Sequence, residues 1–122
     1  MSDVKKRVLF VDDEPNFLES LKRLLREQSY TWDMTFCLST DEALHEVSKA
    51  PFDAIVVTAG APSTPPSLLA QLSPNGGRLV APVGDRDLQY LEIVERRGAE
   101  YVTRRSIGCR FVPLLGAEGW TD

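Results

Sequence analysis

The chain begins with an alternation of apolar runs and amphipathic segments, which is the pattern of an α/β fold. Residues 8–11 form a continuous apolar run, as expected for a strand covered on both faces in a parallel sheet. From Pro15 onward, leucines recur at helical spacing and predict a helix that ends near Ser29. Residues 31–38 are rich in β-forming side chains and predict the second strand. The opening of the chain is therefore β-α-β.

The same alternation continues through the middle of the chain. Residues 39–42, Ser-Thr-Asp-Glu, have the form of a capping box and predict a helix that ends at Pro51. An apolar run at 54–57 predicts the third strand. The proline pair at 65–66 is a favourable start for a third helix, and the sequence Pro-Asn-Gly-Gly at 74–77 is its expected stop.

The last third of the chain loses the helical pattern. Residues 79–83 predict the fourth strand, and two β-rich segments, 88–96 and 100–112, then flank Gly98, which is a hairpin signal. Right-handed crossovers place the second and third strands on opposite sides of the first, so the parallel strands should take the order 2-1-3-4. We predict one three-layer α/β domain over residues 1–122, with an open sheet that ends in an antiparallel hairpin.

Composition narrows the possible partners. The 122 residues, 43% hydrophobic and 26% charged, suffice for one compact core. The net charge is −4 and the basic residues form small separated groups, so no nucleic-acid partner is expected. The N-terminal apolar run is too short for a signal peptide or membrane anchor, which predicts a cytoplasmic protein without membrane contact. Cys37 and Cys109 are far apart in sequence and His45 is the only histidine, so no metal-binding spacing can be drawn.

Two families are visible in the motifs. Residues 7–57 resemble the first half of a response-regulator receiver domain, which has a flavodoxin-like fold, in "LFVDDEPNFLESLKRLL", "LSTDEAL" and "FDAIVV". Residues 53–120 resemble the C-terminal part of protein-L-isoaspartate O-methyltransferase, which has a Rossmann-like fold, in "DAIVVTAGAPSTPPSLLAQL", "GGRLVAPVG" and "RFVPLLGAEGW". The two resemblances overlap only in "FDAIVV". The methyltransferase resemblance implies that the last strand inserts beside the fourth strand, giving the sheet order 2-1-3-4-6-5.

Residue 58 distinguishes the two families. The receiver resemblance implies a phosphoacceptor aspartate five residues after Asp53, but Thr58 stands there and continues the methyltransferase motif. We therefore interpret the chain as a chimera, with a receiver-like half at 1–52 and a methyltransferase-like half at 53–122. We take it to be engineered and recombinant, although a natural protein formed by recombination would have the same sequence. Its expected fold is a flavodoxin-like and Rossmann-like hybrid.

Neither half carries the complete chemistry of the family it resembles. Receiver chemistry needs three carboxylates around Mg²⁺, and only Asp12 and Asp13 remain, which predicts a vestigial, weak Mg²⁺ site. The methyltransferase resemblance implies S-adenosylmethionine on a glycine-rich turn, but the sequence contains no G-x-G. The acidic turn after the first strand would also repel the donor's carboxylate. We therefore expect no catalytic residue, no cofactor-binding residue and no cofactor beyond weakly bound Mg²⁺.

Two functional hypotheses follow from these gaps, beside a third, residual methyl transfer, which would require donor binding. The first is a monomeric engineered scaffold with no evolved catalytic activity and no partner. The alternative is a phosphorylation-independent, receiver-like protein-interaction module. In both cases ligands of an open α/β sheet would bind beyond the carboxyl ends of the first and third strands. We expect Asp12, Asp13 and Thr58 to face one another there, across a shallow pocket floored by Ala59 and Gly60.

Overall fold

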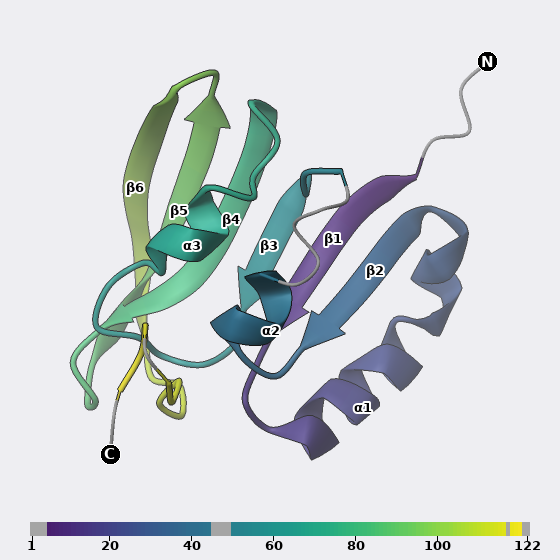
Figure 1. Ribbon diagram of the computed structural model, residues 1–122. Coiled ribbons are helices and arrows are strands. Elements are labelled where there is room, and N and C mark those ends of the chain that lie inside the picture. Colours follow the sequence, from purple (N-terminus) through teal and green to yellow (C-terminus); the bar gives the residue numbers. More distant parts are fainter. Residues whose placement is uncertain (1–4, 45–49, 117, 121–122) are drawn as a thin grey trace.

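One six-stranded sheet organises the computed structural model, which describes residues 5–44, 50–116 and 118–120 (Figure 1). The strand order is β2-β1-β3-β4-β5-β6. In chain order the strands span Lys6–Val11, Trp32–Cys37, Ala54–Val57, Asn75–Gly84, Gln89–Arg97 and Glu100–Cys109. β1 to β4 pair in parallel, and β5 and β6 are antiparallel. The predicted α/β class and the parallel order 2-1-3-4 are confirmed.

The order of the last two strands differs from the prediction. β5, not β6, lies beside β4, so the expected order 2-1-3-4-6-5 is wrong. The cause is the tight turn between β4 and β5, where the Asp85 carboxylate accepts the amides of Asp87 and Leu88, both at 2.8 Å. A Cβ on Gly84 would lie 2.3 Å from the Leu88 carbonyl oxygen, so this turn also needs glycine. The closed turn returns the chain directly onto β4.

The first and third helices are shorter than the sequence predicted. The helices span Pro15–Leu24 (α1), Thr40–Leu44 (α2) and Pro66–Leu69 (α3), with a 3₁₀ helix, η1, at Arg26–Tyr30. The predicted end of the first helix near Ser29 is wrong because the Ser29 and Thr31 hydroxyls bond nearby carbonyls and compete with the α-helical pattern. The predicted end of the second helix depends on residues 45–49, which lie outside the described residues. Among the described helices, none is long and apolar enough to cross a membrane.

β4 begins earlier than predicted, inside the segment expected only to stop a helix. The β4–β5 register shifts between Asn75 and Arg78, where Gly76 has a φ of 93°. This left-handed conformation suits glycine and lets the strand bulge and continue. The strand therefore starts at Asn75 instead of Leu79.

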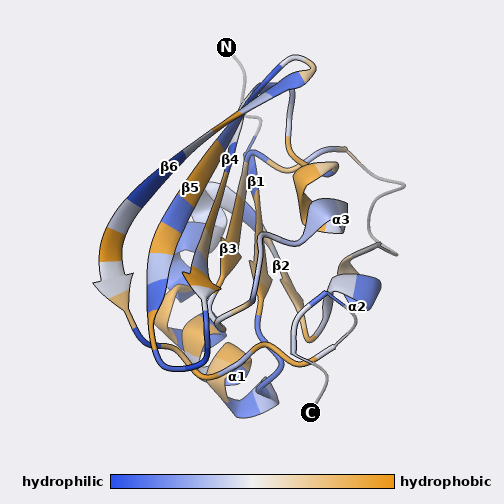
Figure 2. Cartoon of the chain, turned by 90° about the vertical axis from the view of Figure 1, so that its left-hand side faces the viewer, coloured by the Kyte–Doolittle hydropathy of each residue, from blue (hydrophilic) through white to orange (hydrophobic). Residues whose placement is uncertain are grey.

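The two faces of the sheet are covered differently (Figure 2). α2 and α3 lie on one side, over a large cluster that includes Leu9, Ile55 and Leu79, all fully buried. α1 lies on the other side and packs through Leu18 against Val8 and Phe10. Parallel strands need cover on both faces, and both faces have it here. The larger of the two buried clusters lies under α2 and α3.

Candidate functional site

Asp12 and Thr58 meet at the carboxyl ends of β1 and β3, as the sequence predicted. The Thr58 hydroxyl donates to Asp12 Oδ2 at 2.6 Å, and the Glu14 amide donates to Oδ1 at 2.9 Å. Asp12 is only 2% exposed. Both of its carboxylate oxygens therefore have internal donors, and the side chain connects β1 to β3.

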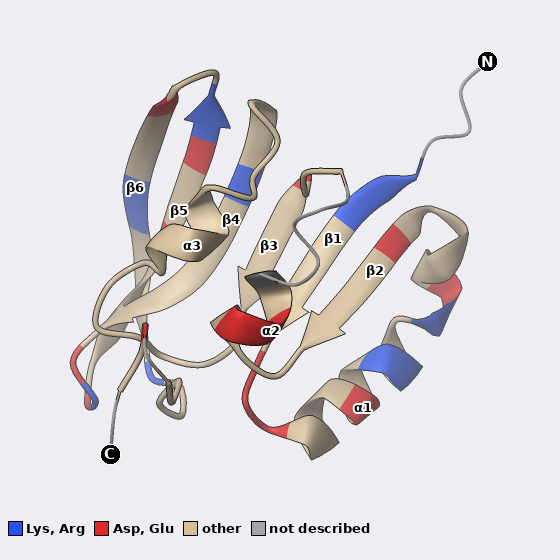
Figure 3. Ribbon diagram, in the orientation of Figure 1, with Lys and Arg blue, Asp and Glu red and all other residues tan. Residues whose placement is uncertain are grey.

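Asp13 points to a different part of the chain. Its Oδ2 accepts the amide of Leu115 at 3.2 Å, so it holds the C-terminal segment instead of joining Asp12 and Thr58. Figure 3 shows the acidic loop between β1 and α1 in which both aspartates lie. Within the described ranges no group of three metal-binding side chains is found. The Mg²⁺ site at Asp12 and Asp13 stays a prediction.

The segment after β3 is fixed by backbone pairing with the C-terminal segment. The Gly60 amide donates to the Val112 carbonyl and the Leu114 amide donates to the Gly60 carbonyl, both at 2.7 Å. Ala61 forms an isolated bridge with Val83 of β4. Residues 60–61 are therefore enclosed between two extended segments. Ala59 is fully buried, and neither Ala59 nor Gly60 is among the residues that line the hollow beside Asp12 and Thr58, so they do not form the floor predicted for it.

Gln89 supports this arrangement, and the sequence pattern did not reveal it. The side chain is 1% exposed, its Oε1 accepts the Phe111 amide at 2.7 Å, and its Nε2 donates to the Asp85 carbonyl at 2.6 Å. A Cβ on Gly60 would lie 3.0 Å from Gln89 Cδ. No period or motif in the sequence marks Gln89, because its burial and its partners are visible only in the structure.

Two hollows flank the segment 110–112. One, of about 340 Å³, lies between this segment and the side chains of Asp12, Phe17 and Thr58. The other, of about 440 Å³, is lined by residues that include Arg86 and Arg110. Arg110 is exposed and lies 3.9 Å from Asp87, which is also exposed, so their ion pair is weak. The site thus combines an acidic, a basic and an aromatic wall.

The C-terminal segment is also anchored at Glu118. Its carboxylate accepts hydrogen bonds from the amide and the hydroxyl of Ser67. Partial burial acts to raise the pKa of Glu118, but hydrogen bonds from Ser67 and Thr40 outweigh it and lower the pKa below 4.5. The ionised carboxylate therefore ties the segment to the start of α3.

Comparison with known proteins identifies one family over nearly the whole chain. The family model described as protein-L-isoaspartate(D-aspartate) O-methyltransferase matches residues 1–119. The protein-L-isoaspartate O-methyltransferase of Staphylothermus marinus is 45% identical over 116 residues, covering 94% of this chain and 51% of that protein. The protein-L-isoaspartate O-methyltransferase of Methanopyrus kandleri is 42% identical over 117 residues, covering 95% of this chain and 51% of that protein. The chain spans about half the length of these curated relatives.

A solved structure supports the fold. The crystal structure of a Plasmodium falciparum protein, described as a putative protein-L-isoaspartate O-methyltransferase in complex with S-adenosyl-L-homocysteine, has a TM-score of 0.61. It is 20% identical, with 90% of this chain and 66% of that chain covered. At this identity the likeness shows the fold alone, a Rossmann-like α/β sheet.

These matches correct the functional interpretation drawn from the motifs. A single family model over residues 1–119 and relatives above 40% identity contradict an engineered chimera or scaffold. The relatives bear the names of enzymes, so the expectation of a non-enzymatic protein, whether scaffold or interaction module, is also overturned. A methyltransferase family implies a methyl donor, which the expectation of no cofactor omitted. The methyltransferase resemblance of 53–120 is supported, whereas a receiver-like half is not shown.

Proposed function

Because the chain belongs to the protein-L-isoaspartate(D-aspartate) O-methyltransferase family, we propose that it acts in methyl transfer to isoaspartyl carboxyl groups of proteins. In this proposal the described residues form the acceptor side of the site. One observation carries it: segment 110–112 is fixed beside Thr58, with a hollow on either side and Arg110 at their common border. The methyl group itself would come from S-adenosylmethionine.

The chemistry of this border suits an anionic acceptor. An isoaspartyl residue presents a free carboxylate on a short branch, and an arginine guanidinium binds carboxylates through two parallel hydrogen bonds. Arg110 is available for this role because its contact with Asp87 is long and solvent-exposed. Phe111, whose amide is held by buried Gln89, offers an apolar surface to the branch. Arg110 would thus orient the acceptor, and Phe111 would exclude water beside it.

The turn after β1 does not fit the methyl donor. A glycine-rich turn leaves backbone N–H groups free for the ligand, but here the amides of Asp12 and Glu14 already donate to the Cys37 carbonyl and to Asp12 Oδ1. Pro15 has no N–H, so these three positions offer the donor nothing. The nearby carboxylates would repel the donor's carboxylate. No step of the transfer is therefore assigned to this turn, and donor binding has to be measured separately from acceptor binding.

The test compares two peptides of one sequence, one with an isoaspartyl residue and one with an ordinary aspartyl residue. Calorimetric titration should show tighter binding of the isoaspartyl peptide, and Arg110→Gln should weaken that binding by about tenfold or more, the typical loss for a charge-assisted pair. Arg97→Gln is the matched control and should leave the affinity unchanged. Arg97 lies at the end of β5 that is farther from segment 110–112, whereas Gln89, at the other end, contacts that segment. Equal affinity for the two peptides would contradict acceptor recognition.

Transfer is measured in the same series with S-adenosylmethionine labelled in its methyl group. The proposal predicts an isoaspartyl methyl ester, which is detected as base-labile label on the peptide. Selective peptide binding without label would restrict this chain to the acceptor side of the reaction. The proposal would be overturned if the peptide neither bound selectively nor acquired label.

A further inference from the structure

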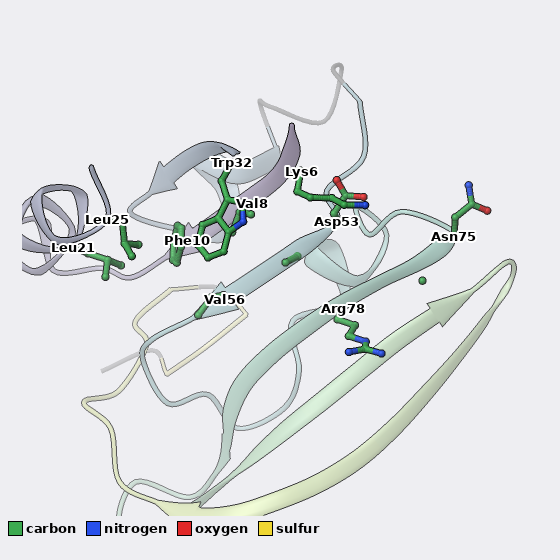
Figure 4. Close-up of a pocket in the computed structure, with 12 residues that line it drawn as sticks. Lys6, Val8, Phe10, Leu21, Leu25, Trp32, Asp53, Val56, Asn75 and Arg78 are labelled. Atoms are coloured by element: carbon green, nitrogen blue, oxygen red, sulfur yellow. The ribbon is translucent and has the colours of Figure 1, made fainter. Parts of the chain in front are cut away.

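A cavity separate from the proposed acceptor site lies between α1 and the sheet (Figure 4). It has a volume of about 580 Å³ and reaches the amino ends of β1, β3 and β4 at Lys6, Ala54 and Asn75. The two hollows at segment 110–112 share no lining residue with it. Small-molecule sites typically have volumes of about 300–1,000 Å³. The cavity is therefore large enough for a ligand that methyl transfer does not use.

The side of the cavity next to α1 is apolar. Its lining residues there are Leu21, Leu25, Trp32, Phe10 and Val56. Phe10 is almost fully buried, whereas the other four are half-buried and leave apolar surface accessible. A ligand that displaces water from these side chains gains the free energy of burying apolar surface. This side therefore suits a hydrocarbon group.

The side away from α1 is polar and has an excess of positive charge. Figure 4 shows Lys6, Asp53, Asn75 and Arg78 on this side. Arg78 also lines an adjoining hollow of about 140 Å³ over β4, β5 and β6. The charged residues that line either space are four basic and two acidic ones: Lys6, Arg78, Arg97, Arg104, Asp53 and Glu95. The area thus carries two positive charges in excess, on a chain whose net charge is −4.

Both carboxylates of this area already have donors within the protein. Asp53 Oδ2 accepts the backbone amide of Arg7 at 2.9 Å. Glu95 Oε1 accepts two hydrogen bonds from the Arg97 guanidinium, at 2.9 and 3.2 Å. Glu95 is therefore paired with Arg97, and the remaining basic side chains are only partly neutralised.

The basic side chains nearest the cavity lack partners of this quality. Arg78 approaches Glu95 only to 3.8 Å and its side chain is 64% exposed, so this ion pair is weak. The side chains of Lys6 and Arg104 have no hydrogen bond or ion pair with any part of the chain that the structure describes. These three cations remain available to an anion.

We propose that the cavity binds an aliphatic carboxylate, in which a hydrocarbon chain carries one anionic head group. The chain lies on the apolar side beside α1, and the carboxylate lies at Arg78, whose guanidinium can donate two parallel hydrogen bonds to it. The excess positive charge selects the head group, because a cationic head group is repelled and an uncharged one gains no electrostatic attraction. Binding is independent of methyl transfer, since the cavity and the proposed acceptor site share no lining residue.

Calorimetric titration with amphiphiles of equal chain length tests the head-group preference. Decanoate, decanol and decyltrimethylammonium differ in charge, and each is used below the concentration at which it forms micelles. Decanoate should bind at least about tenfold more tightly than the other two, the gain expected from one charge-assisted pair. Arg78→Gln should weaken the binding of decanoate by about tenfold and leave that of decanol unchanged.

Arg105→Gln is the matched control, since Arg105 pairs with Glu92 at 3.5 Å and lines neither the cavity nor the adjoining hollow. It should leave the affinity for decanoate unchanged. Ala54→Leu extends a side chain into the cavity and should weaken the binding of decanoate and decanol alike, by at least about tenfold. Circular dichroism with and without decanoate checks that each variant is folded.

Three results would overturn the proposal. The first is the absence of saturable decanoate binding up to about 1 mM. The second is binding of decanol or decyltrimethylammonium that is as tight as that of decanoate, because the positive charge would then select nothing. The third is decanoate binding that Ala54→Leu leaves unchanged, or that Arg105→Gln weakens as much as Arg78→Gln, because the ligand would then lie elsewhere.

Discussion

The hydrogen bond from Thr58 to Asp12 can be tested by Thr58→Val, which removes the hydroxyl and keeps the shape of the side chain. The bond is 2.6 Å long and its acceptor is a carboxylate that is 2% exposed. Hydrogen bonds to charged groups contribute about 1.5–3 kcal/mol, and a buried carboxylate that loses one donor retains its desolvation cost. The Glu14 amide still satisfies the other oxygen, so we expect a loss near the middle of that range, about 2 kcal/mol.

The measurement is urea unfolding at pH 7, followed by far-UV circular dichroism. A thermal melt run in parallel should show the Tm lowered by roughly 6–10 °C for a chain of 122 residues. Thr103→Val is the control, because Thr103 is an exposed residue of edge strand β6 and its change should stay within about 0.5 kcal/mol. If Thr58→Val also stays within that limit, Asp12 does not depend on Thr58 and the connection between β1 and β3 has been assigned wrongly.

Three further predictions concern the same region. Thr58→Asp places a second carboxylate against Asp12, so thermal melts should show lower stability without metal and partial recovery as Mg²⁺ is added; equal Mg²⁺ response in the parent would refute a site there. The pKa of Glu118 is lowered in the folded chain, so its stabilisation is complete above the unfolded value of 4.5 and is lost as pH falls through the folded value; Glu118→Gln should remove this part of the pH dependence of urea unfolding. Gly60→Ala puts a Cβ 3.0 Å from Gln89 and should cost about 1–3 kcal/mol in the same assay, whereas an unchanged stability would show that Gln89 can move aside.

The sequence predicted the strands well where one physical signal dominated. The apolar runs at 8–11 and 54–57 are strands, the first buried throughout and the second at alternate residues. The carboxyl-end position of Asp12 and Thr58 followed from parallel topology alone. The boundaries failed where side chains bonded the backbone locally. Ser29 shortened the first helix in this way, and the Asp85 turn decided which strand pairs with β4.

The residues that shape the proposed acceptor site could not be found from local sequence pattern. Gln89 acts through the Phe111 amide, 22 positions away, and Arg110 matters only because the C-terminal segment returns to Thr58. Neither relationship leaves a period or motif in the sequence. Long-range backbone pairing, such as that of Gly60 with Val112, had to be seen before these residues could be placed together.

The acidic pair after β1 has a physical role that needs neither phosphate nor metal. Asp12 accepts the Thr58 hydroxyl and Asp13 accepts the Leu115 amide, so each aspartate bonds a residue more than 40 positions later in the chain. Carboxylates at this turn therefore join the β1 end of the sheet to β3 and to the C-terminal segment that carries Arg110. Loss of the Asp13 contact should therefore disturb the position of the C-terminal segment, and with it the proposed acceptor site, before it unfolds the sheet.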